Sequence, residues 1–173
     1  MLKRVISLCC LAIAGTTAAT ADTNVIPAAP NGIEFPADYP DWRVISVSHR
    51  IDHKSMRVIV GNDVAVKAAR EGNTNPWPEG SALGKVVWKE APEADWQTAI
   101  APDRFIHAEF MFKDSKKWSD NATGWGWARW VGNDHKPYGQ DVNFSQECIA
   151  CHTPVKGKDW VFTKPASFPS VMK

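Results

Sequence analysis

The sequence predicts an α+β fold: a single small domain dominated by an antiparallel β-sheet, with a few short helices. Segments rich in β-branched and aromatic residues outnumber the segments with helical character. These segments do not alternate regularly with helices, as the strands of a parallel sheet do. The chain has 173 residues, and about 150 of them remain after an N-terminal leader is removed, which is enough for one domain with its own core.

The first 21 residues have the features of a secretory signal peptide. Lys3 and Arg4 precede an apolar stretch, residues 5–15, that is too short to cross a bilayer as a helix. The small residues at 19–21 then suit cleavage before Asp22. We expect export without a membrane anchor. The alternative is a signal that is retained as an anchor.

The charge balance of the mature chain is nearly neutral. Loss of Lys3 and Arg4 reduces the 20 basic residues to 18, against 19 acidic ones. This balance gives no reason to expect a nucleic-acid partner or a polybasic contact with a membrane. The mature chain keeps all nine tryptophans, which favours a thick aromatic core or a pocket around a large, flat, apolar ligand.

In the first half of the chain, the sequence pattern predicts a leader, three strands and a helix. Residues 22–40 contain four prolines and predict an extended leader that wraps the domain or stays mobile, so the domain itself should span residues 41–173. Asn62 or Asp63 suits the N-cap of a short helix, and Gly72 suits its end. The segments expected are strands over residues 41–51, 56–61 and 82–90, a helix over residues 64–72, and a loop over residues 73–81.

The strand expected over residues 104–114 has two different faces. Because side chains alternate along a strand, one face should be uniformly apolar and meet the core, and the other should be mixed. The apolar face consists of Ile106, Ala108, Phe110 and Phe112, and the mixed face of Phe105, His107, Glu109 and Met111. The mixed face fits a pocket wall or a side that faces water.

Three further elements are expected towards the C-terminus. Residues 113–118 predict a short turn of helix. Residues 124–131 alternate small and large side chains, so Trp125, Trp127 and Arg129 should face away from Ala128 and Trp130. Residues 145–152 predict a helix, with Ser145 as its N-cap.

The most specific motif is CIACH, residues 148–152. On a helix, Cys148, Cys151 and His152 share one face. Two thiols at this spacing can add to the two vinyl groups of a haem, and the following histidine can become an axial ligand of its iron. Export supports this interpretation, because c-type haem attachment occurs on the periplasmic side of a bacterial membrane. We therefore predict a periplasmic protein with one covalently attached haem c.

Three alternatives for the cysteine pair fit less well. A thioredoxin-like redox pair requires a βαβ setting, and the sequence around the motif does not predict one. A disulfide between residues three apart in a helix is strained. A zinc site needs further ligands, and the mature chain has no second cysteine pair.

The distal side of the haem iron is expected to be open. An electron-transfer cytochrome usually supplies a methionine or a second histidine there. Only 21 residues follow His152, and the domain is rich in strands, unlike small helical cytochromes. The residues considered as sixth ligands are Met56, Met111, Met172, His49, His53, His107 and His135.

Several motifs in this order resemble the cytochrome P460 family, which includes the β-sheet cytochromes c′. The motifs are PWPEGSALGKVVWK, KDSKKW, GWGWARW and CIACHTPVKGKDWVFTK. The resemblance runs from about Asp38 to Thr163. It implies a mainly antiparallel β fold, a homodimer, and a c-type haem with an open distal face.

Two positions bear on the branch of this family. In the hydroxylamine-oxidising members a lysine is bonded to the haem ring and a distal carboxylate assists proton removal. Counting along the family motifs places these residues at Lys85 and Glu109. The c′-type members lack the cross-link and bind nitric oxide in an apolar pocket, and the Trp-Lys pair after Lys85 is closer to theirs. Lys85 as an ordinary strand lysine and Glu109 as a solvent-facing carboxylate remain alternatives.

The sequence thus leaves three functions. The leading hypothesis is hydroxylamine oxidation to nitrous oxide, with Glu109 as a base, Lys85 as a third link to the haem, and an external acceptor, another cytochrome, for the electrons. The second is binding of nitric oxide without a cross-link. The third is electron transfer by a six-coordinate haem.

Overall fold

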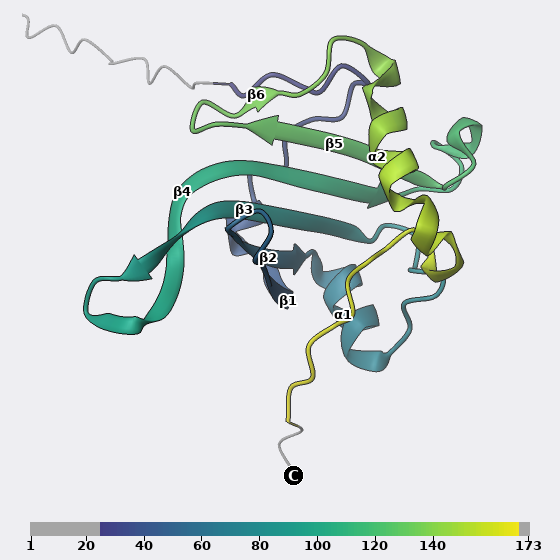
Figure 1. The fold of residues 1–173 in the computed structure, drawn as a ribbon. Helices are drawn as coiled ribbons and strands as arrows, with labels where there is room; N and C mark the ends of the chain where they lie inside the picture. Colours follow the sequence, from purple (N-terminus) through teal and green to yellow (C-terminus); the bar gives the residue numbers. More distant parts are fainter. Residues whose placement is uncertain (1–24, 170–173) are drawn as a thin grey trace, which may run out of the picture.

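The computed structural model describes residues 25–169, so the expected signal peptide lies outside the described residues. Six strands form one antiparallel sheet in the order β1-β2-β3-β4-β5-β6, and two short helices pack on it (Figure 1). This confirms the α+β prediction. The elements are β1 (Arg43–Arg50), β2 (Ser55–Gly61), α1 (Asp63–Glu71), β3 (Ala82–Glu93), β4 (Trp96–Lys113), β5 (Trp125–Val131), β6 (Lys136–Pro137) and α2 (Ser145–His152). No helix in the described range is long and apolar enough to cross a membrane.

Strands β3 and β4 extend well beyond the segments expected, forming a hairpin arm that projects from the sheet (Figure 1). The sequence analysis assigns no element to residues 91–103, which include Pro92 and Pro102. Pro92 pairs with Ile100, and Pro102 pairs with Glu90. Each proline lies where its strand has no second neighbour, because β2 and β5 pair only with the inner part of the hairpin. A strand with one free edge tolerates a missing N–H.

Two local predictions near the ends of elements have different outcomes. Lys113 ends β4, and the helical turn expected over residues 113–118 is confirmed at residues 114–118, where the amide of Trp118 donates to the carbonyl of Asp114 at 3.0 Å. A 3-10 helix follows at Ser119–Asn121. The N-cap predicted at Ser145 is wrong. Ser145 is the first residue of α2, not its N-cap, and its hydroxyl donates to the carbonyl of Val142. The N-cap position is Phe144, whose side chain provides no capping hydrogen bond. The short strand β6 was not anticipated.

The sheet is packed on both faces. The face that carries α1 and α2 has a core formed by Ile45, Ile59, Ala65, Val66, Ala68, Ala69, Trp77, Leu83, Trp125, Trp127 and Val161. The opposite face has an aromatic core formed by Ala29, Ile33, Ala108, Phe110, Ala128, Trp130 and Phe144. Residues of the proline-rich segment cover this second core, where the indole of Trp130 donates to the carbonyl of Pro27.

A β-bulge changes one expected face of β4. Val87 pairs with His107 and the next residue, Trp88, pairs with Phe105, so Ile106 is an extra residue on β4. The alternation therefore shifts at Ile106. Phe105 packs against the aromatic core and not beside Glu109, contrary to the sequence prediction. The opposed faces expected for Trp127 and Trp130 are confirmed.

Asn62 joins helix α1 to the sheet. Its side-chain oxygen accepts from the amides of Ala65, at 3.0 Å, and Ala82, at 3.1 Å. Its side-chain nitrogen donates to the carbonyl of Gly80 at 2.9 Å. Asn62 is thus the N-cap, one of the two predicted, and Gly72 ends the helix in a left-handed conformation with φ 74°.

Replacing Asn62 should therefore destabilise the fold. We expect Asn62→Ala to lower the free energy of unfolding by about 2 kcal/mol, because the cap and two bonds to the β2–β3 connection are lost together. Asn62→Asp keeps the acceptor and should cost less. Urea denaturation of the mature protein measures both, and equal midpoints for Asn62→Ala and the wild type would contradict the assignment.

Candidate haem-binding site

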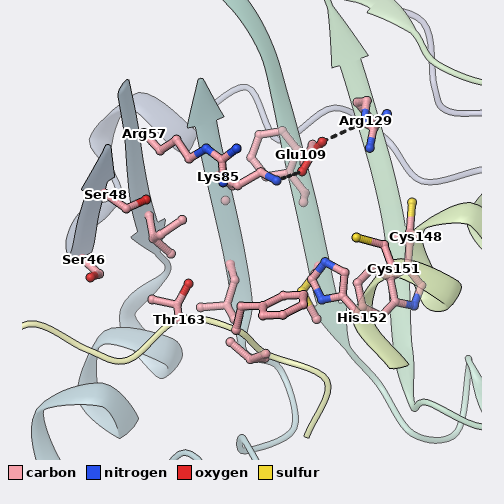
Figure 2. Close-up of a pocket in the computed structure, with 18 of the residues that line it drawn as sticks. Ser46, Ser48, Arg57, Lys85, Glu109, Arg129, Cys148, Cys151, His152 and Thr163 are labelled. Atoms are coloured by element: carbon pink, nitrogen blue, oxygen red, sulfur yellow. Dashed lines mark ion pairs between the residues drawn. The ribbon is translucent and has the colours of Figure 1, made fainter. Parts of the chain in front are cut away.

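A cavity of about 540 Å³ lies between the sheet, helix α2 and the segment after it. Figure 2 shows α2 on one side and strands β1 to β5 behind. This volume lies within the range typical of sites for cofactors. The apolar part of its wall includes Ile59, Leu83, Met111, Trp127, Val161 and Phe162. The polar part includes Arg50, Arg57, Lys85, Glu109, Arg129 and Lys164.

The three residues of the CIACH motif all line this cavity. Cys148, Cys151 and His152 come from the last turns of α2 and gather on the side facing the sheet (Figure 2). Both thiols are free. Cys148 is half-buried, and burial raises the pKa of its thiol although the Arg129 cation acts in the opposite direction. Two free thiols and one imidazole therefore face the same space.

The imidazole of His152 is held in one orientation. Its Nδ1 lies 2.6 Å from the carbonyl oxygen of Trp160, so Nδ1 carries the proton and donates it. The rings of Trp127 and Phe162 pack edge-on against it, with centroids at 4.7 Å and 5.0 Å. Burial lowers the pKa of His152. Burial thus favours the neutral imidazole, which is the form that binds a metal through Nε2.

Lys85 and Glu109 lie opposite each other on β3 and β4 and form an ion pair at the cavity wall (Figure 2). Arg129 on β5 is the strand partner of Glu109 on β4. Its Nε lies 2.8 Å from the other carboxylate oxygen of Glu109. Burial raises the pKa of Glu109, but the Lys85 and Arg129 cations outweigh it and the net shift is downward. Glu109 is therefore an anion held between two cations and, in this arrangement, a weak base.

His107 completes this group. Its Nε2 lies 3.3 Å from Glu109, but burial lowers the pKa of His107 to about 4 despite the nearby carboxylate. Lys85, Arg129 and Arg57 also disfavour its protonated form. The contact at neutral pH is therefore between a neutral imidazole and a carboxylate.

Among the described residues considered as sixth ligands, only Met111 lines the cavity. His49 pairs with Glu90, and His53 lies 3.5 Å from Asp52. His135 packs against Phe35 and Phe105, which belong to the opposite face. Met172 lies outside the described residues.

Sequence reasoning missed the cationic side chains of the cavity. Arg57 comes from β2 and Arg129 from β5, and both point into the cavity (Figure 2). The signal that could have found them is an arginine at an inward-facing position of a strand. The alternation of residues 124–131 gave this signal for Arg129. Within the described part of the chain, the Nε atom of Arg57 is buried and has no hydrogen-bond acceptor.

The residues present fit a c-type haem. The cavity has the donor set that haem attachment needs, two free thiols and an oriented neutral imidazole. The buried Nε of Arg57, which has no acceptor, suits a carboxylate of the kind that a haem carries. The apolar wall suits its flat ring.

His107 should make stability depend on pH. An unfolded chain protonates this histidine near its ordinary value of 6.5, while the folded protein does so near 4. The unfolded state therefore binds more protons between these values, and stability falls as pH falls through this window. We expect a loss of up to about 2 kcal/mol between pH 6.5 and about pH 5. His107→Gln cannot titrate and should show a flatter profile in thermal denaturation, and parallel profiles would contradict the burial argument.

Comparison with known proteins identifies the family. A search of the curated proteins finds no match. A protein-family model described as Cytochrome P460 matches residues 36–163. This match covers most of the chain and includes Lys85, Glu109 and the whole CIACH motif. The chain therefore belongs to the cytochrome P460 family and is a c-type haem cytochrome.

Proposed function

We propose that this protein is an exported, periplasmic cytochrome that oxidises hydroxylamine to nitrous oxide. One observation carries the proposal: Lys85 and Glu109 face the same cavity as Cys148, Cys151 and His152. The two residue types that the hydroxylamine-oxidising branch requires thus lie on adjacent strands, in direct contact with each other.

Cys148 and Cys151 would hold the haem through thioethers, and His152 would bind its iron through Nε2. A haem held in this way supplies a coordination position for the nitrogen of hydroxylamine and a route for its electrons. Two molecules of hydroxylamine yield nitrous oxide, water, four protons and four electrons. The electrons require an external acceptor, for which another cytochrome is our proposal, and the family suggests that the protein works as a homodimer.

Glu109 would accept protons from the substrate, and Lys85 would control how well it does so. While Lys85 is an ammonium, it helps to lower the pKa of Glu109. A lysine nitrogen bonded to the haem ring is no longer an ammonium, so one of the two cations beside Glu109 disappears. The pKa of Glu109 should then rise, and the carboxylate should become a better base.

A second candidate function is binding of nitric oxide without turnover. The pairing of Glu109 with Lys85 and Arg129 favours it, because a carboxylate held between two cations is a poor base. The apolar part of the cavity wall would suit an uncharged gas. Simple electron transfer, the third hypothesis, depends on a sixth ligand, and Met111 at the cavity wall would be that ligand.

Replacing Lys85 tests the proposed cross-link. After proteolysis of the holoprotein, we expect one haem-bearing fragment that contains both the CIACH peptide and the peptide of Lys85. The ferrous protein should show a strongly red-shifted absorption band. Lys85→Met should lose the second peptide, the red shift and the production of nitrous oxide.

The control is Lys89→Met, which removes an exposed lysine from the same strand and should change none of these properties. Wild-type protein with only the thioether-linked peptide, or Lys85→Met with undiminished turnover, would contradict the role of Lys85. An ordinary high-spin spectrum together with rapid nitric oxide binding would favour the second candidate.

Replacing Glu109 tests the proposed base. We expect Glu109→Gln to lower kcat for hydroxylamine by about 100-fold or more, because proton transfer by a positioned base contributes that much. Binding of nitric oxide should be retained, since it needs no base. Glu93→Gln, on the distant hairpin arm, serves as the control. Turnover by Glu109→Gln at the wild-type rate would rule out this role.

A further inference from the structure

The carbonyl that contacts His152 belongs to a turn with an unusual backbone. Asp159 and Trp160 are consecutive residues with φ of 50° and 65°, the left-handed region that residues other than glycine rarely occupy. A bulky tryptophan is especially uncommon there. Such a conformation persists only where the surrounding structure imposes it.

A buried ion pair and two hydrogen bonds impose it here. Lys113 Nζ lies 2.7 Å from one carboxylate oxygen of Asp159, and the two side chains are only 7% and 10% exposed. The amide of Trp77 donates to the other carboxylate oxygen at 2.9 Å, and the indole of Trp125 donates to the carbonyl of Asp159 at 3.0 Å. The end of β4, the loop before β3 and the start of β5 thus all converge on this one residue.

The turn places the carbonyl group of Trp160 at the site. With Asp159 fixed, the carbonyl of Trp160 lies 2.6 Å from His152 Nδ1 (the imidazole is labelled in Figure 2). A hydrogen bond from Nδ1 fixes the tautomer and the ring orientation of a ligating histidine and makes the imidazole a stronger donor to its metal. A stronger axial donor in turn stabilises the oxidised iron of a haem.

We propose that Lys113 and Asp159 are positioning residues, which set the orientation and donor strength of His152 through the carbonyl of Trp160. Neither residue lines the cavity, so neither would touch the haem or the substrate. The inference rests on the proposed ligation of haem by His152 and does not depend on which small molecule reacts there.

The test compares three variants of the holoprotein: Lys113→Met, Asp159→Asn and the double variant. Each single variant leaves one buried charge without its partner and is expected to lose stability. The double variant leaves no buried charge, so it should fold. In the double variant we expect the iron–histidine stretching frequency of the ferrous protein to fall and the reduction potential to rise, because His152 loses its fixed hydrogen bond.

The matched control is Val66→Ala, which opens a cavity in the same core but makes no hydrogen bond to the turn. It should lower the unfolding midpoint and leave the stretching frequency and the potential unchanged. Wild-type values in the double variant, or equal shifts in Val66→Ala, would overturn the proposal. Hydroxylamine turnover is assayed separately, so a wild-type protein with a histidine-bound haem but no turnover would contradict only the proposed reaction.

Discussion

Strand β4 is packed on one face and lines a cavity on the other, and the geometry of the site depends on this division. Ala108 and Phe110 are almost fully buried in the aromatic core, next to Trp130 on β5. Fully burying a large apolar side chain contributes about 1.5–3 kcal/mol, so this core strongly resists a shift of register. Because side chains alternate, fixing Ala108 and Phe110 also fixes Glu109 between them.

The same register assembles the charges of the site. Glu109 pairs with Lys85 on one neighbouring strand and with Arg129 on the other, so a cation flanks it on each side. Arg57 adds further positive charge at the cavity, whereas Arg50 is paired with Asp52. Cations outnumber carboxylates in this wall, and partly buried cations are stable only when anions balance them. The wall therefore favours an anionic ligand, which agrees with a haem that carries two carboxylates.

The parts of this protein that could be predicted from sequence depend on local spacing. Cys148, Cys151 and His152 share a helix face wherever that helix lies, so the motif alone indicated the candidate haem site. Asn62 and Gly72 delimit α1 through their own backbone preferences. Lys85 and Glu109 were located by counting along family motifs. Their contact follows from the register between β3 and β4, which no local sequence pattern predicts.

The features that sequence reasoning missed depend on partners distant in the chain. The bulge at Ile106 moves Phe105 to the other face, and only the pairing of β3 with β4 reveals it. The prolines of the hairpin arm are tolerated because neighbouring strands end before them. Likewise, the turn at Asp159 depends on Lys113, 46 residues earlier in the chain.

Helix α2 shows why these distant contacts matter for the haem. It has eight residues, none of them fully buried, and no side-chain N-cap. A helix this short is not stable by itself. Phe144 anchors its start in the aromatic core, and the hydrogen bond between His152 and Trp160 anchors its end. Between these two points, thioether bonds from Cys148 and Cys151 would join α2 to the sheet through the haem. The cofactor would thus form part of the hydrophobic core, and its attachment would complete the packing of the helix that binds it.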